Sequence, residues 1–344
     1  MRGVPDPVVR AFLSMADDSI VAVLPYALAI AARLEVADAC APEGSTAEEL
    51  AAGVGFSAGP LRSLLNALTG AGFFTRDEHG RFTPTELGAV LTAGSAVSMR
   101  ATLSNVDTYR AWLRAADAAA ERRPMTAADG ESFFEDRDTD PPSVAFNTRM
   151  QERATRLYAG LAGLPVWDGA RTVMDIGGGT GTVLSAVLRA QPQLNGVLFD
   201  RKSVIELAAR AGPLDPVRPR CALAAGSFFD ELPGGADVHL LCSVLHDWDD
   251  RKAASILQAS RSAVAAPGRI LVCELIVPET PDAHPAHWSD LGMTVLLGGR
   301  ERTLPEFDGL FAAAGLVRTR VLPVEGSIFS VVEAVVADPA SPRS

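Results

Sequence analysis

Four polar residues that could bind a ligand or transfer a proton lie in the second half of the chain: Asp200, Ser227, His246 and Glu274. Each follows a short apolar segment with the composition of a buried strand, and these segments are 196–200, 221–225, 236–243 and 269–274. Helical patterns separate the segments, which predicts a doubly wound α/β sheet. Ligands bind such sheets at the carboxyl ends of the strands, so we expect the four side chains to converge on one crevice.

A glycine-rich stretch, Thr-Val-Met-Asp-Ile-Gly-Gly-Gly-Thr-Gly-Thr, occupies residues 172–182. The pattern predicts a buried strand over 172–176, a glycine turn, and a helix that begins at Val183. Glycine permits a tight turn and lets a ligand approach the backbone, because it has no Cβ atom. Asp200 ends the next strand, where a carboxylate can accept hydrogen bonds from both hydroxyls of a ribose. The glycine turn and this acid together predict a nucleoside cofactor.

The composition argues against several classes of protein. A length of 344 residues favours two domains over one. The net charge of −11 argues against a nucleic-acid partner, because such binding depends on neutralisation of phosphates by Lys and Arg. The four cysteines show no CxxC spacing and are expected to be reduced.

Two observations predict a cytoplasmic protein with no membrane partner. The first residues lack the apolar centre of a signal peptide. The most apolar stretch, 20–39, is interrupted by Pro25, Arg33 and Glu35, which favours a buried helix over a membrane span. We expect the apolar face of this helix to be buried. It could pack against a second subunit or against the protein's own core, and both interpretations are open.

A winged-helix order follows: a capped helix from Ser45, a helix over 60–71, and a hairpin that turns at His79 and Gly80. Such a module could bind DNA. Its second helix, however, carries Arg62 as its single cation, which is poor for phosphate contacts. We therefore favour a dimerisation and lid module.

The sequence predicts three parts: an N-terminal helical, winged-helix-like domain over 1–100, a helical connection with pocket helices over 101–163, and the nucleoside-binding domain over 164–338. A helix over 143–163 leads into the glycine strand, and the domain boundary is expected in or near it. The acidic stretch 129–142 is interpreted as a surface connection.

Six motifs in one fixed order make the chain resemble the S-adenosylmethionine-dependent small-molecule O-methyltransferases, which include plant caffeate and flavonoid enzymes and bacterial natural-product tailoring enzymes. The motifs are 173–181, 199–200, 226–229, 245–250, Glu274 and 298–303. The resemblance spans nearly the whole chain. It implies a homodimer with a Rossmann-like catalytic domain and a winged-helix dimerisation domain, and S-adenosylmethionine as cofactor. It also implies methyl transfer to a phenolic hydroxyl of a small aromatic acceptor.

The resemblance also implies which residues contact the cofactor. Gly177 and Gly179 would line its methionine end, Asp200 would hold the ribose, and Ser227 and Phe228 would flank the adenine. Ser227 departs from the family pattern, because the usual residue there is Asp. Cys242 replaces a lysine of the plant members, which makes Cys242 and its neighbour Ser243 weaker predictions.

In the family, the catalytic base is the histidine of the His-Asp-Trp motif, here His246. A free phenol has a pKa near 10 and a histidine near 6.5, so full proton transfer in water is uphill by roughly 5 kcal/mol. The base therefore needs an acid that holds the imidazole and supports its charge. Glu274 and Glu301 match the family's flanking acids, and Asp247 is adjacent to the base.

The resemblance predicts an acceptor pocket with contributions from Phe146, Met150, Trp288, Asp290 and Met293. The apolar members, and Leu297, could equally be plain core, and Asp290 could instead cap its helix. The two histidines of 284–287 have HxxH spacing, but the prolines around them oppose a metal-binding helix, so no metal is expected.

Three alternatives remain open at this stage. Some relatives with the same fold and cofactor hydroxylate or decarboxylate their substrates. These relatives lack the catalytic histidine, whereas this chain has His246. The same base could also serve N- or C-methylation. A ligand-sensing winged-helix regulator is the alternative outside enzymes. The Ala-, Arg-, Gly- and Pro-rich composition resembles that of high-GC bacteria and favours natural-product biosynthesis as the setting.

Overall fold

A computed structural model describes residues 18–126, 130–135, 142–210, 212–280 and 283–337. The chain divides into two compact units. The first ends at Tyr109 and the second begins at Arg110. The predicted boundary in or near 143–163 therefore differs from the division that the backbone shows. The helix at 142–157 packs on the helix at 182–190, which belongs to the second unit. The three-part division remains a prediction.

The first unit follows the predicted order of two helices and a hairpin. Its elements are α2 (Asp18–Arg33), α3 (Ala47–Val54), α4 (Ala58–Gly70), β1 (Phe74–Arg76), β2 (Phe82–Pro84), η1 (Leu87–Leu91) and α5 (Arg100–Leu103). The predicted capping signal is present, because the hydroxyl of Thr46 accepts from Glu49 N and Glu49 caps Thr46 N in return. Arg62 of α4 forms an ion pair with Glu48. This pairing neutralises the cation that a contact with a DNA phosphate would need.

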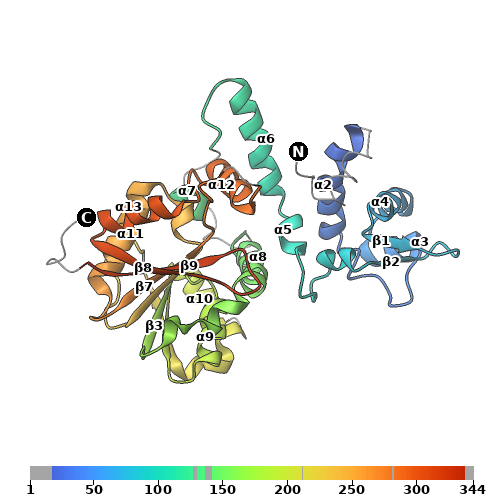
Figure 1. The fold of residues 1–344 in the computed structure, drawn as a ribbon. Coiled ribbons are helices and arrows are strands. Elements are labelled where there is room, and N and C mark those ends of the chain that lie inside the picture. Colours follow the sequence, from blue (N-terminus) through green and yellow to red (C-terminus); the bar gives the residue numbers. More distant parts are fainter. Residues whose placement is uncertain (1–17, 127–129, 136–141, 211, 281–282, 338–344) are drawn as a thin grey trace. The chain divides into compact units, whose positions relative to one another are not determined.

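The second unit contains the predicted doubly wound α/β sheet (Figure 1). Its strands are β3 (Thr172–Ile176), β4 (Asn195–Asp200), β5 (Cys221–Ala225), β6 (Val238–Cys242), β7 (Arg269–Glu274), β8 (Leu316–Pro323) and β9 (Ser330–Val336). They lie in the order β5-β4-β3-β6-β7-β9-β8, in which β5 to β7 run parallel and β9 pairs antiparallel with both neighbours. The strand order reverses beside β3, and this is where such sheets bind ligands.

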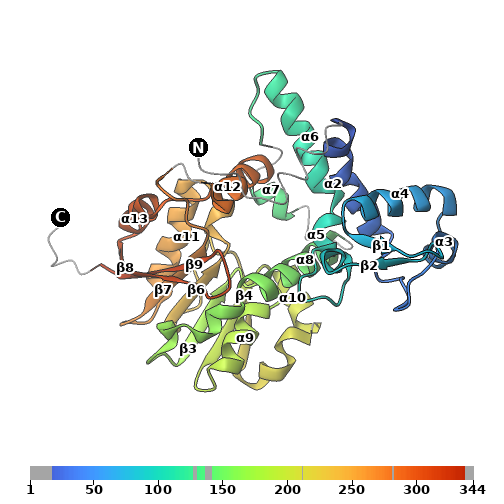
Figure 2. The same ribbon diagram turned by 45° about the vertical axis from the view of Figure 1, so that its right-hand side comes forward.

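Helices cover both faces of this sheet because its central strands bury both faces. In β7, Ile270 and Val272 belong to one core cluster, whereas Leu271 between them belongs to the other. The helices of this unit are α9 (Thr182–Ala190), α10 (Lys202–Arg210), η4 (Gly212–Arg220), η5 (Leu245–Asp247), α11 (Asp250–Ala263) and α13 (Leu304–Ala313). Figure 2 shows α9 apart from α11 and α13, which pack together on the other face.

Further helices precede the sheet or follow β7. They are α6 (Val106–Ala120), α7 (Gly130–Glu135), α8 (Pro142–Leu157), η2 (Ala159–Gly163), η3 (Pro165–Trp167) and α12 (Pro285–Leu296). The sequence predicted one helix over 101–125, but the structure breaks it between α5 and α6. Asn105 explains the break, because its side chain accepts from Asp107 N and donates to Thr108, as in a helix cap. Among the described helices, none is long and apolar enough to cross a membrane.

Candidate active site

The glycine turn after β3 needs glycine for two different reasons. Gly177 and Gly179 have φ values of +69° and +59°, which side chains rarely adopt. A Cβ atom on Gly178 would instead lie 2.5 Å from Leu198 Cδ1 and 2.6 Å from a carboxylate oxygen of Asp175. The turn therefore exposes backbone rather than side chains at the end of β3.

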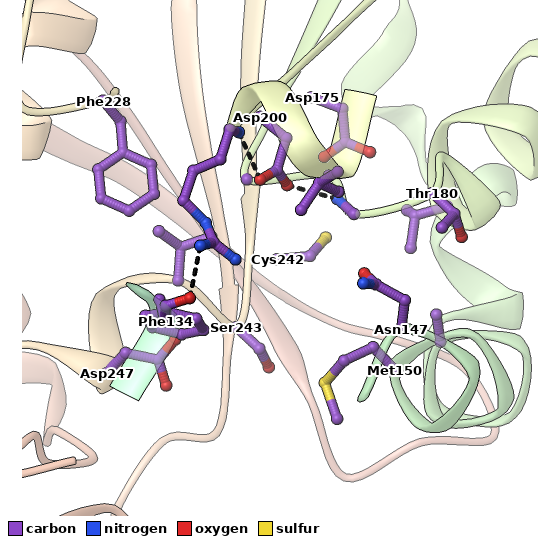
Figure 3. Close-up of a pocket in the computed structure, with 18 of the residues that line it drawn as sticks. Phe134, Asn147, Met150, Asp175, Thr180, Asp200, Phe228, Cys242, Ser243 and Asp247 are labelled. Carbon is purple, nitrogen blue, oxygen red and sulfur yellow. Dashed lines mark hydrogen bonds between the residues drawn. The ribbon is translucent and has the colours of Figure 1, made fainter. Parts of the chain in front are cut away.

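Asp200, at the end of β4, is held by the backbone of this turn. One carboxylate oxygen accepts from Gly179 N at 2.8 Å and the other accepts from Arg201 N at 2.7 Å (Figure 3). A carboxylate has about four lone-pair positions, so these two bonds alone do not use up its capacity to accept hydrogen bonds. The predicted ribose acceptor is thus fixed in place beside the glycine turn.

A cavity of about 410 Å³ opens at this end of the sheet, within the usual size of ligand pockets. It is lined by every residue that the sequence predicted for the cofactor: Gly177, Gly179, Asp200, Ser227, Phe228 and Ser243. The predicted acceptor residues Phe146 and Met150 also line it. Figure 3 shows Asn147 and Met150 extending from α8 toward the cavity, with Asp200 and Cys242 on its far side.

Ser227 lines the cavity but uses its hydroxyl locally, since Oγ accepts from Phe229 N at 3.2 Å. Ser243 has a φ of +51°, unusual for a residue with a side chain, and its hydroxyl bonds to the Tyr158 hydroxyl. Both serines therefore fix the loops at the strand ends.

Asp175 is an acid that the sequence motif contained but that we did not assign to the site. It lines the cavity and is 1% exposed. Burial, and secondarily the charge of Asp200, raise the pKa of Asp175 to about 7. A cation that entered the cavity would favour the ionised form of both acids.

The turn that carries His246 is organised by Glu274, the last residue of β7. Glu274 Oε1 accepts from Val244 N at 3.0 Å and from Leu245 N at 2.9 Å. Leu245 begins η5, so the carboxylate satisfies the free N–H groups of that turn. The predicted acid thus shapes the backbone of the loop as well as facing the imidazole.

His246 is buried, at 5% exposure, among three acids. Its Nδ1 lies 2.8 Å from Glu301 Oε1 and 3.4 Å from Glu274 Oε2, and its Nε2 lies 3.5 Å from Asp247 Oδ1. Burial alone would lower the pKa of His246, but the charges of Glu274, Glu301 and Asp247 outweigh it and raise the pKa to about 10. The four predicted catalytic residues therefore form one cluster.

The pKa values of the acids in this cluster are shifted in different directions. Burial raises the pKa of Glu274 to about 7, against the lowering effect of the His246 charge. Burial also acts to raise the pKa of Glu301, but the charge and hydrogen bond of His246 leave it below its ordinary value. Near neutral pH the ion pair of the cluster is therefore His246 with Glu301.

The same cluster has a spacing that a metal ion could use, because ligand atoms of His246, Glu274 and Glu301 lie within 4.8 Å of one another. The 2.8 Å distance between His246 Nδ1 and Glu301 Oε1, however, fits a hydrogen bond.

Three residues of the motif 298–303 hold the His246 turn in place. The fully buried Arg302 donates to Leu245 O at 2.9 Å and to Trp248 O at 2.8 Å, and it pairs with Asp250. A Cβ atom on Gly299 would lie 2.1 Å from His246 O, so the two backbones touch there. Arg300 N also donates to His246 O at 2.9 Å.

The lining of this cavity does not include the other predicted acceptor residues, Trp288, Asp290 and Met293. Trp288 is 80% exposed, and Asp290 accepts from Glu301 N at 2.9 Å, which positions that acid. His284, of the HxxH pattern, caps α12 by accepting from Ala286 N.

Sequence reasoning missed several polar residues that line the cavity: Asn147, Gln151, Arg153, Tyr158, Asp175 and Thr180. Four of them lie on or just after α8, and three of these, Asn147, Arg153 and Tyr158, are three or eight positions from Met150. That spacing was the available signal, because residues three positions from a pocket residue share its face of a helix.

Two family models match the chain. One, described as the O-methyltransferase domain, matches residues 112–317, and the other, the O-methyltransferase dimerisation domain, matches residues 20–94. A phenazine O-methyltransferase from Lysobacter antibioticus is 38% identical over 317 residues, which cover 89% of this chain and 91% of that protein. A 2,7-dihydroxy-5-methyl-1-naphthoate 7-O-methyltransferase from Streptomyces carzinostaticus is 37% identical over 90% of this chain and 93% of that protein.

A solved structure agrees with these matches in fold. An O-methyltransferase from neocarzinostatin biosynthesis, in complex with S-adenosylmethionine and 2-hydroxy-5-methyl naphthoic acid, superposes with a TM-score of 0.78 at 32% identity. The alignment covers 98% of this chain and all of the other.

The raised pKa of Asp175 predicts a stability difference that depends on pH. An unfolded Asp ionises near pH 4 and the folded one near 7, so folding loses stability as pH rises between these values, by up to about 4 kcal/mol. Asp175→Asn removes this loss. We expect the variant to raise the thermal midpoint at pH 8 more than at pH 5. An equal difference at both pH values would contradict the raised pKa.

The contact at Gly299 predicts that Gly299→Ala destabilises the fold, by about 1–3 kcal/mol, because the new methyl group overlaps the backbone of the His246 turn. Gly292→Ala is the matched control, since Gly292 lies inside α12 with no neighbour within 4 Å of its Cβ position. The control should keep or raise the thermal midpoint. If both variants behaved alike, the contact would not constrain the turn.

Proposed function

Since the chain belongs to the family of S-adenosylmethionine-dependent O-methyltransferases, we propose that it methylates a phenolic hydroxyl of a small aromatic acceptor, with His246 as general base. The cofactor supplies an electrophilic methyl group on a positively charged sulfonium. The observation that carries the choice of base is the imidazole held between two buried carboxylates.

The three acids raise the proton affinity of His246 toward that of a phenol. With an ordinary pKa, His246 would be about 3.5 units too weak to take a proton from a phenol. With its pKa raised to about 10, the neutral imidazole matches the proton affinity of the phenol. The same shift protonates His246 near neutral pH, so the imidazole must lose its proton before it can act as the base, and the proposed transfer uses the neutral form of the ring.

The cavity fits the cofactor of this family. We propose that Gly177 and Gly179 take its methionine end, that Asp200 accepts from its ribose, and that Ser227, Phe228 and Ser243 contact the remainder. The exposed glycine backbone permits close approach, and Asp175 and Asp200 place negative charge where a cationic ligand gains from it. Ser227 brings no charge to the adenine side.

The acceptor must reach His246 past Asp247. His246 is not in the cavity lining, whereas Asp247 and Trp248 are, and the Asp247 carboxylate lies 3.5 Å from Nε2. We propose that the acceptor hydroxyl binds beside Asp247 and that Nε2 receives its proton. Contacts of this kind often tighten only when substrate is bound.

We propose a natural-product setting and an aromatic acceptor that packs against Phe146 and Met150. Phe134 and Trp248 line the same cavity, with their ring centres 5.9 Å apart. The similar enzymes are named for a phenazine and a naphthoate, which are flat aromatic compounds.

We propose that the first unit forms a homodimer. The dimerisation family model covers most of that unit. Its α2 helix leaves Val23, Tyr26 and Ile30 about half exposed, at 52%, 45% and 46%. Three large apolar side chains at helical spacing on one helix form a patch that association would bury.

The test of the base is His246→Ala, assayed with labelled S-adenosylmethionine and a panel of phenols, catechols and polyketide-like aromatics. We expect turnover to fall at least about a hundredfold while cofactor affinity, measured by calorimetry, stays nearly unchanged. Product masses are recorded, because a gain of one oxygen would indicate hydroxylation instead. Equal turnover in wild type and variant would exclude His246 as the base.

Glu301→Gln tests how the base is tuned. Loss of the carboxylate lowers the pKa of His246, so the rise of kcat/KM with pH should move to lower pH, and the plateau rate should fall because the base is weaker. Wild type and variant are compared with the same acceptor, so that ionisation of the acceptor affects both pH profiles equally. Superimposable profiles would show that Glu301 does not set the pKa.

A further inference from the structure

Arg153 of α8 is a cation whose position the fold does not explain. It lines the cavity, and its Nε is buried without a hydrogen-bond partner among the described residues. Its guanidinium carbon lies 5.7 Å from the centre of the Phe329 ring. The buried Arg302 offers a contrast, because it donates to two backbone carbonyls and pairs with Asp250.

The charge of Arg153 acts on the side of the cavity that holds the base. Burial dominates the raised pKa of Asp247, against which the charges of His246 and then Arg153 act to lower it. Arg153 also acts to lower the pKa of Glu301, after burial and the stronger effects of His246 and Ser289. Asp175, beside the glycine turn, is influenced by Asp200 and not by Arg153. Against the dominant effect of burial, Arg153 also acts to lower the pKa of Tyr158, whose hydroxyl bonds to Ser243.

A guanidinium whose Nε is buried without a partner in a ligand cavity is well satisfied by a planar anion. Carboxylates accept two parallel hydrogen bonds from arginine, and the pairing strengthens away from bulk water. The same cavity is walled by Phe134, Phe146 and Trp248, which suit a flat ring. The lining thus combines aromatic walls, a base and a cation.

We propose that the acceptor is an aromatic carboxylic acid and that Arg153 binds its carboxylate, so that the acid group selects the substrate and orients its hydroxyl toward His246. This inference rests on the proposed methyl transfer. The cofactor's own carboxylate is the other source of the same chemistry. We commit to the acceptor because Arg153 lies three positions after Met150, a predicted acceptor residue, on the same face of α8, and both side chains line the cavity.

The experiment compares 3-hydroxy-2-naphthoate with 2-naphthol, which differ only in the carboxylate. Affinities are measured by calorimetry on the enzyme loaded with S-adenosylhomocysteine, and methyl transfer is measured separately. The variant is Arg153→Met, with Arg153→Gln if the first does not fold. Arg149→Met is the matched control, because Arg149 lies one turn earlier on α8, packs over Phe146 and is not part of the cavity lining.

We expect wild type to bind the naphthoate about ten- to a hundredfold more tightly than the naphthol, and Arg153→Met to abolish that preference while naphthol binding stays the same. The control should retain the preference. A selective loss of S-adenosylmethionine affinity in Arg153→Met would assign the arginine to the cofactor and overturn the proposal. Absence of any preference in wild type would overturn it as well.

The binding and transfer readouts separate the two proposals. Arg153-dependent binding of the naphthoate without methyl transfer would support the anion site and count against the proposed reaction. Methyl transfer to both compounds with equal efficiency, unaffected by Arg153→Met, would support the reaction and overturn the anion site.

Discussion

The buried imidazole of His246 between Glu274 and Glu301 is the interaction on which the rest of the site depends. A carboxylate taken out of water is costly unless it is paired and hydrogen-bonded, and here the compensation comes from the protonated ring and from backbone N–H groups. The same contacts hold the ring in one orientation. Removing either acid would therefore alter both the geometry of the turn and the proton affinity of the ring.

The surrounding backbone is built to keep this turn in place. Arg302 binds the carbonyls on both sides of His246, and Gly299 allows the following segment to pack directly on the turn. Asp290, which we expected to contact the acceptor, instead holds Glu301 through its backbone N–H. Positioning of one side chain thus involves three segments that are distant in the sequence.

The cavity has acids at both ends, with Asp175 and Asp200 beside the glycine turn and Asp247 near the base. Each end suits a positive charge, carried by the ligand at one end and by the protonated imidazole at the other. Arg153 is the exception on the acceptor side, and this asymmetry is what points to an anionic acceptor. Electrostatics therefore distinguishes the two ends of a single cavity.

The sequence by itself determined the strands and the glycine turn, because strand periodicity and glycine spacing are local properties. It also predicted that Asp200, Ser227, His246 and Glu274 converge, since strand ends in a doubly wound sheet share one edge. The proposed roles of Asp247, Glu301 and the remaining cofactor-side residues came from the family resemblance. Only the tertiary structure decided that Trp288 lies in solvent, that Arg153 faces the cavity and that His246 has a raised pKa. Exposure, helix rotation and pKa depend on neighbours from distant segments, and packing alone brings those neighbours together.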